Sequence, residues 1–266
     1  MNYLLKYGLE SNPFIKNNND VKLDLNNTKQ LLFRLRHLEE TKGIGLITGS
    51  PGLGKSTAIR HWAKSLNNNL YKVIYIAHST ISIHDFYKEL SEKLGIEEYY
   101  SKRKNLNNIQ FEIKRLWYEK RITPVIILDE ANYLPSAVLN DLKIILNFDM
   151  DSKEPYILLL VGQNTIRASL NMQAHEAFKQ RISMNFNFQP MDKDESRKYI
   201  DEKLKLARAN QKILTDEAYN QIIGVANGTP RKINQYMDKA LLLMENKKLD
   251  IIDEVTMMEA IDEITI

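Results

Sequence analysis

Short apolar runs recur through the first two thirds of the chain, separated by segments in which apolar residues repeat with a helical period. Each run has five or six residues and is bounded by polar residues, glycine or proline, which is typical of a buried strand. The runs lie at 44–48, 73–77, 124–128, 156–161 and 183–188. Strands that alternate with helices predict an α/β fold, with a five-stranded parallel sheet flanked by helices on both faces.

The segments between the runs predict helices, and the pattern changes after Pro190. Helices are expected near 28–41, 55–67, 82–94, 105–121 and 135–147, with Ser82 as the N-cap of the third. Beyond Pro190 the strand-like runs stop, and four helical segments follow. We therefore expect an N-terminal segment over 1–27, an α/β domain over 28–190 and an all-helical domain over 191–266.

The first apolar run leads directly into a glycine-rich loop. Gly49, Gly54, Lys55 and Ser56 fit the pattern G-x-x-x-x-G-K-[ST], and the flanking strand and helix supply the context that this pattern requires. Backbone N–H groups of such a loop surround phosphate oxygens, and the following helix presents its positive end to them. Lys55 should reach the β- and γ-phosphates of a nucleotide, and Ser56 should ligate Mg²⁺. The expected nucleotide-binding residues of the loop are Gly49, Pro51, Gly52, Leu53, Gly54, Lys55, Ser56 and Thr57.

A second motif, VIILDEAN, begins within the apolar run at 124–128 and continues into an acidic pair. Carboxyl ends of parallel strands share one edge of a sheet, so Asp129 and Glu130 should lie near the glycine-rich loop. We expect Asp129 to hold Mg²⁺ through its water shell and Glu130 to act as the general base that orients and polarises the attacking water. The alternative interpretation is a strand followed by an acidic helix cap.

The next run ends in an amide pair, Gln163 and Asn164. Either side chain could hold the same water or sense the γ-phosphate, and Gln163 is the first choice. A plain turn at the strand end is the alternative interpretation.

Several further stretches carry a family resemblance: YGLESNPF near the start, LDEANYLPSAVLNDLKIILNF, LLLVGQN, FKQRI and NGTPRKIN. With the two motifs above, the chain resembles the AAA+ ATPases, and among them the ExeA-like group that includes the transposition helper ATPases TniB, TnsC and MuB. The resemblance runs nearly from end to end. It implies a AAA+ P-loop ATPase with ATP and Mg²⁺ as cofactors, a C-terminal helical lid, and an N-terminal segment in which Asn12, Pro13 and Phe14 border the adenine.

The resemblance also implies roles for two arginines. Arg181 matches the arginine finger of the family, and Arg231 matches the second sensor in the lid. The alternatives are a surface arginine before a strand for Arg181 and a helix-start arginine for Arg231. A finger supplied by a neighbouring subunit implies a homo-oligomer, either a ring or a helical filament, with ATP at each subunit interface.

The composition and the length of the apolar stretches indicate where in the cell the protein is expected. The chain has no cysteine, which excludes disulfides and thiolate metal sites. The N-terminus lacks the basic-then-apolar layout of a signal peptide, and the longest apolar stretches are far shorter than the roughly 20 residues that cross a bilayer. We expect a cytoplasmic protein without a membrane segment.

The excess of positive charge is concentrated in one segment of the chain. Residues 99–121 contain seven basic and two acidic residues. In assemblies of the resembled kind, loops from this region line the inner surface, so Lys102, Arg103 and Lys104 should contact the backbone of double-stranded DNA without reading its sequence. The alternative is a solvated basic loop, followed by an exposed basic helix face that carries Lys114, Arg115, Lys120 and Arg121.

The function favoured by these features is ATP-dependent regulation of DNA transposition. Such a protein would assemble on target DNA with ATP, hydrolyse ATP under stimulation by DNA, and recruit or stimulate a transposase. The alternative function is that of a cytosolic ExeA-like ATPase that acts on protein partners in secretion or assembly.

Overall fold

The computed structural model describes residues 4, 6–16, 25–77 and 82–264, which form two compact units. An α/β unit comprises Lys29–Ser50 and Lys55–Phe188. A helical unit comprises Met1–Thr28, Pro51–Gly54 and Gln189–Ile266. Each unit has its own hydrophobic core.

Five parallel strands form the sheet of the α/β unit, which confirms the predicted fold class. They are β1 (Gly43–Thr48), β2 (Tyr71–Ile76), β3 (Thr123–Leu128), β4 (Ile157–Gly162) and β5 (Ile182–Asn187). Their order in the sheet is β2-β3-β4-β1-β5. The three inner strands are buried along their whole length, which is why their sequences read as unbroken apolar runs. The edge strand β2 instead alternates between exposed and buried residues towards its carboxyl end.

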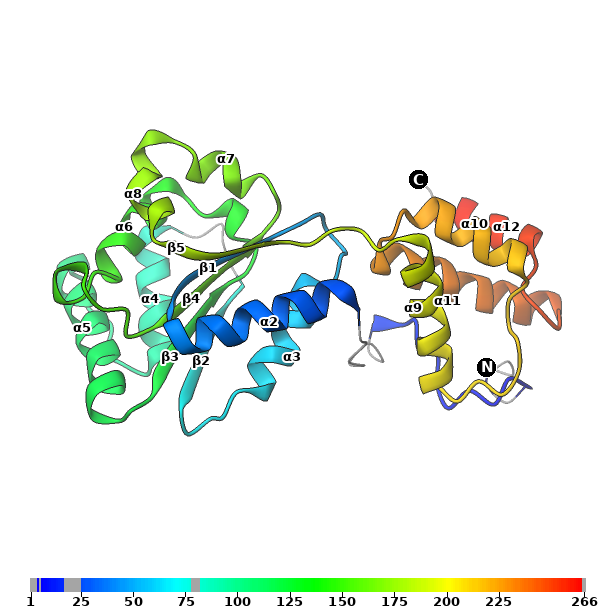
Figure 1. Ribbon diagram of the computed structural model, residues 1–266, viewed down its shortest axis with the longest axis horizontal. Coiled ribbons are helices and arrows are strands. Elements are labelled where there is room, and N and C mark those ends of the chain that lie inside the picture. The colour runs from blue at the N-terminus through cyan, green and yellow to red at the C-terminus, as the bar shows by residue number, and fades with distance from the viewer. Residues whose placement is uncertain (1–3, 5, 17–24, 78–81, 265–266) are drawn as a thin grey trace. The chain divides into compact units, whose positions relative to one another are not determined.

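Helices cover both faces of the sheet (Figure 1). They are α2 (Asn26–Thr41), α3 (Lys55–Ser65), α4 (Ile83–Leu94), α5 (Lys102–Lys114) and α6 (Ser136–Ile145). Apolar residues of α4, α5 and α6 share a core cluster with one face of the strands. On the opposite face Leu38 of α2 lies against Gly45, and Trp62 of α3 donates to Glu39 of α2. The Ser82 side chain accepts from the Asp85 N–H, which confirms the predicted N-cap of α4.

Local structure differs from the sequence pattern in three ways. The basic stretch expected as a loop at Lys102–Lys104 is the first turn of α5, and the helix expected over 105–121 changes to a π-helix, η2, at Arg115–Glu119. Several short helices were not predicted, because three to five residues are too few to show a period. They are η3 (Ala131–Tyr133), η4 (Asp149–Asp151), α7 (Ile166–Leu170), η5 (Gln173–His175) and α8 (Glu176–Gln180).

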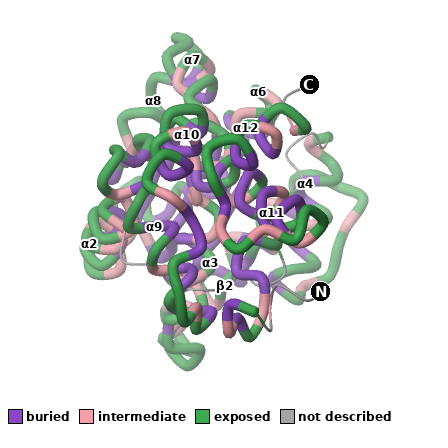
Figure 2. Tube along the Cα trace, turned by 90° about the vertical axis from the view of Figure 1, so that its right-hand side faces the viewer, coloured by how far each residue is buried: buried purple, intermediate pink, exposed green. Residues whose placement is uncertain are grey.

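Four long helices form the helical unit, as the pattern after Pro190 predicts. They are α9 (Lys193–Leu206), α10 (Asp216–Ala226), α11 (Pro230–Lys247) and α12 (Glu254–Asp262). Side chains of Asp192, Thr215 and Asp253 cap the N-termini of α9, α10 and α12. Buried positions recur along each helix (Figure 2), and Tyr7, Leu9 and Phe14 complete this core. In the described part of the chain, no helix has both the length and the apolar character to cross a membrane.

Candidate active site

The glycine-rich loop connects the end of β1 to the start of α3. Lys55 is the first residue of α3, and its Nζ donates to the carbonyls of Gly49 at 2.7 Å and Ser50 at 2.9 Å. Gly54, just before the helix, has a φ of 95°, a backbone conformation that favours glycine. The helix N-terminus, the loop amides and the lysine are the groups from which a phosphate-binding loop is built.

Asp129 lies directly after β3 and accepts hydrogen bonds on both carboxylate oxygens. Its Oδ2 accepts from the Ser56 hydroxyl at 3.1 Å and from the Tyr75 hydroxyl at 2.8 Å, and its Oδ1 accepts from the Glu130 N–H at 3.0 Å. Ser56 belongs to α3 and Tyr75 to β2, so elements distant in the sequence meet at one carboxylate. Burial and then the hydrogen bond to Asp129 raise the pKa of the Tyr75 phenol, which keeps it protonated as a donor.

These residues fit a magnesium ion. The Ser56 hydroxyl, at the start of α3, and the Asp129 carboxylate, directly after β3, are hard oxygen donors 3.1 Å apart. Protein sites for Mg²⁺ commonly supply only one or two carboxylates, because phosphates and waters complete the coordination. The described residues hold no group of three or more His, Cys, Asp or Glu that could bind a metal. Ser56 and Asp129, whose oxygens lie within hydrogen-bond distance of each other, are the candidate ligands.

Glu130 is exposed and has a left-handed backbone, with φ 52° and ψ 36°. This conformation is uncommon for a residue with a side chain and is found at functional sites, where the surrounding structure stabilises it. The turn that follows is tied to the neighbouring strand, because the Gln163 N–H donates to Asn132 Oδ1 at 2.8 Å. Gly162 permits this contact, since a Cβ there would lie 2.6 Å from the same oxygen.

The amide pair after β4 therefore has a fixed backbone position. Gln163 is half-buried and Asn164 is exposed, and both precede the short helix α7. The link through Asn132 was not predicted, although Asn132 belongs to the quoted VIILDEAN motif. Tyr75 was not predicted either, and only the alternation of exposed and buried residues along β2 could have indicated it.

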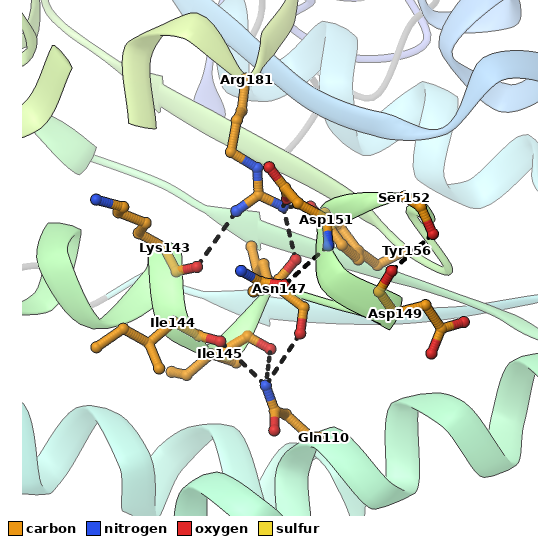
Figure 3. Close-up of polar contacts among 11 residues, drawn as sticks. Gln110, Lys143, Ile144, Ile145, Asn147, Asp149, Asp151, Ser152, Tyr156 and Arg181 are labelled. Atoms are coloured by element: carbon orange, nitrogen blue, oxygen red, sulfur yellow. Dashed lines mark hydrogen bonds and ion pairs between the residues drawn. The ribbon is translucent and has the colours of Figure 1, made fainter. Parts of the chain in front are cut away.

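Arg181 binds acceptors of its own chain (Figure 3). Its guanidinium donates to the carbonyls of Lys143 at 3.2 Å and Leu146 at 2.7 Å and to the Tyr156 hydroxyl at 3.0 Å, and it pairs with Asp151 at 3.1 Å. The two carbonyls lie at the C-terminal end of α6, where helix carbonyls lack intrahelical partners and a cation is favourable. The side chain, which is 12% exposed, thus caps α6 in the isolated chain.

Gln110 donates to the same helix end. Its Nε2 lies 3.0 Å from the Ile144 carbonyl, 3.2 Å from that of Ile145 and 3.3 Å from that of Asn147 (Figure 3). Arg181 and Gln110 therefore bind different carbonyls of one helix terminus.

In the helical unit, the predicted adenine-bordering residues lie among buried side chains. Asn12 donates to Asp238 at 2.6 Å, and Lys203 donates to the Pro13 carbonyl at 2.6 Å and lies 5.3 Å from the centre of the Phe14 ring. Burial lowers the pKa of Lys203 to about 8. Lys203 was not predicted, because a lysine within a charged helix gives no signal of burial.

Arg231 lies in the first turn of α11, with an exposed side chain. Its backbone N–H donates to the Gly52 carbonyl at 3.2 Å within the helical unit.

The predicted DNA-contacting residues differ from one another in their surroundings. Lys102 pairs with Asp141 at 2.7 Å, and this carboxylate is 7% exposed and also accepts from the Tyr87 hydroxyl at 2.9 Å. Lys104 lies 5.7 Å from the centre of the Tyr99 ring, and Arg103 is exposed. All three residues are exposed, and Lys102 also compensates a buried charge of its own chain.

Comparison with known proteins agrees with this geometry. A family model described as AAA domain matches residues 36–170. General secretion pathway protein A of Aeromonas hydrophila is 26% identical over 248 residues, covering 90% of this chain and 44% of that protein. The ATP-dependent target DNA activator B of Escherichia phage Mu is 29% identical over 117 residues, covering 44% of this chain and 35% of that protein. The chain thus spans less than half the length of these two relatives.

Solved structures show the same fold at low sequence identity. Cdc6p from Pyrobaculum aerophilum has a TM-score of 0.68 at 17% identity, covering 90% of this chain and 67% of that one. The Aeropyrum pernix ORC1 protein, in a structure with DNA, has a TM-score of 0.66 at 17% identity, covering 95% of this chain and 68% of that one. Because the matching family model spans half of the chain, this protein belongs to the AAA domain family, as an ExeA-like AAA+ ATPase with similarity to the phage Mu activator.

Proposed function

We propose that this protein is an ATP-dependent DNA-binding regulator of transposition. It assembles on double-stranded target DNA with ATP and recruits or stimulates a transposase. The observation that carries the proposal is the similarity to a target DNA activator over 117 residues, in a chain whose surface cations Arg103 and Lys104 share one helix turn.

Hydrolysis in this proposal uses the residues around Asp129. Lys55 would bind the β- and γ-phosphates, and Ser56 and Asp129 would hold Mg²⁺, which would supply positive charge against the charge that develops on the phosphate oxygens. Glu130 accepts a proton from the attacking water, and the amide of Gln163 or Asn164 orients that water. In the helical unit, Asn12, Pro13 and Phe14 border the adenine, and Arg231 senses the nucleotide.

The proposal assigns Arg181 to the ATP of a neighbouring subunit. In the isolated chain its guanidinium caps α6, so assembly has to exchange these acceptors for the γ-phosphate. An arginine supplied in trans can accelerate phosphoryl transfer by about 10³ to 10⁵. The monomer is then a poor ATPase, and specific activity rises with protein concentration.

Mixing two inactive variants tests the trans assignment. Arg181→Ala keeps Glu130, and Glu130→Gln keeps Arg181, so random co-assembly restores about one interface in four. Recovery of ATPase activity in the mixture supports the finger, and no recovery rejects it. Gln110→Ala is the matched control, because it removes donors to the same end of α6 and leaves Arg181 in place. This control should keep ATPase activity and rising concentration dependence.

ATPase activity with and without duplex DNA tests the DNA part of the proposal. We expect stimulation by unrelated duplex sequences alike, and weaker stimulation at high salt, since backbone contacts carry the binding. Electron microscopy with a slowly hydrolysed ATP analogue should show DNA-dependent rings or filaments.

A second candidate is an ATPase that acts on protein partners in secretion or assembly. The alignment with the secretion pathway protein over 90% of this chain favours it. An ATPase that assembles with ATP but neither binds DNA nor responds to it would support this second candidate over the first.

A further inference from the structure

Two hydroxyls share one oxygen of the Asp129 carboxylate. Tyr75 Oη lies 2.8 Å from Oδ2 and Ser56 Oγ lies 3.1 Å from the same atom. The other oxygen accepts the Glu130 N–H at 3.0 Å. Donors from β2, from α3 and from the turn after β3 therefore fix the orientation of this buried carboxylate.

Strand register explains how Tyr75 reaches Asp129. Tyr75 pairs with Ile127 in the parallel ladder between β2 and β3, and Asp129 follows Ile127 by two residues. Residues two apart on a strand project from the same face, and diagonal neighbours lie within reach of a long aromatic side chain. Tyr75 therefore points its hydroxyl along the sheet towards the strand end.

The burial pattern of β2 argues against packing as the role of this tyrosine. Ile74 and Ile76 point into the core, whereas Tyr75 is 47% exposed on an edge strand. A side chain placed there for packing alone would leave about half of its surface in solvent. The feature that distinguishes Tyr75 is the hydroxyl bound to Asp129.

We propose that Tyr75 is a positioning residue of the magnesium site, which holds the Asp129 carboxylate in the orientation that receives the ion. The proposal rests on the Mg²⁺-ATP site described under the proposed function. Ser56 has to serve both the ion and the carboxylate, whereas the Tyr75 hydroxyl serves the carboxylate. Partners that orient metal-binding carboxylates typically contribute about 10- to 100-fold to metal affinity or activity.

Tyr75→Phe tests the proposal, because it removes one hydroxyl and keeps the ring. The control is Tyr71→Phe on the same face of β2, where the ring contacts Lys42 instead of Asp129. Binding of a fluorescent ATP analogue is measured in EDTA and then across a Mg²⁺ titration, without DNA. For Tyr75→Phe we expect unchanged affinity in EDTA, about tenfold more Mg²⁺ at the half-maximal effect, and near wild-type affinity at saturating Mg²⁺. Tyr71→Phe should follow the wild type throughout.

Two results overturn the positioning role. A Mg²⁺ midpoint for Tyr75→Phe equal to that of the wild type shows that Ser56 and the backbone suffice. Loss of affinity in EDTA together with a lowered unfolding temperature shows a structural role. If the wild type itself binds the analogue without any response to Mg²⁺, the magnesium part of the proposed function fails as well, and the two failures are thereby distinguished.

Discussion

The carboxyl end of β3 and the first turn of α5 lie in the same unit, yet their charged residues are used differently. At β3, hydroxyls of Ser56 and Tyr75 converge from two other elements on Asp129. At α5, Lys102 is bound to the buried carboxylate of Asp141. One charged group lies at the candidate magnesium site, and the other compensates a charge of the fold.

Two further cations of the basic stretch are also paired with carboxylates. Lys114 pairs with Asp149 at 3.2 Å, and Arg115 pairs with Glu112 at 2.7 Å. In a motif that spans a strand, a loop and a helix, the backbone of these elements determines where the side chains point. A run of like charge does not, because acidic residues within the run or elsewhere in the chain can pair with its members. The predictions below test this difference, from the largest expected effect to the smallest.

Lys55→Ala should abolish ATP binding and ATP-dependent assembly, lowering nucleotide affinity about 100-fold or more. The reason is that the cation facing the β- and γ-phosphates is lost. Titration with a fluorescent ATP analogue measures the affinity, and light scattering measures assembly. The control is Lys64→Ala in the last turn of the same helix, which should bind ATP like the wild type. Near wild-type affinity of Lys55→Ala would contradict the phosphate-loop assignment.

Glu130→Gln should keep ATP binding and lower the turnover rate by about 10²- to 10⁴-fold, because it keeps the shape of the side chain and removes the base. The variant should accumulate in the assembled, ATP-bound state. Single-turnover hydrolysis and size analysis of the assembly are the measurements. Wild-type turnover would show that another group positions the water.

Lys102→Ala should lower the free energy of unfolding by about 1–2 kcal/mol, because the buried Asp141 loses its cation. This loss is smaller than for a fully buried ion pair, because the lysine side chain is 58% exposed and solvent screens the pair. Arg103→Ala, one residue along, should change stability by less than about 0.5 kcal/mol. Urea unfolding monitored by circular dichroism compares the two variants. Equal effects would remove the proposed difference between these neighbours.

The double variant Arg103→Ala/Lys104→Ala should weaken duplex DNA binding equally across unrelated sequences. It should also flatten the slope of log affinity against log salt by about two, one phosphate contact per residue. ATP binding should be unchanged, which serves as the internal control. A wild-type salt slope in this variant would exclude the first turn of α5 as the DNA path.

Lys102 is left out of this variant deliberately. Its removal would weaken DNA binding through lost stability as well as through lost charge, and the two causes could not be separated.

Much of the architecture follows from local sequence. The five apolar runs become the five strands within two residues at each end. In the three inner strands, burial on both faces leaves a continuous apolar signature. The Ser82 cap and the four helices after Pro190 likewise depend on neighbours within a few positions. The phosphate-binding loop could be predicted for the same reason, since its residues are adjacent along the chain.

Tertiary structure decided which distant side chains meet. Tyr75 contacts Asp129 across 54 residues of sequence, and this contact depends on the strand order and on the register of β2 with β3. Likewise Arg181 caps α6 from 35 residues away, and Lys102 binds Asp141 from 39. Periodicity and motif spacing carry information over a few residues. Pairing between elements is settled by burial and hydrogen bonding in the folded chain, where each polar group takes the partner that packing brings within reach.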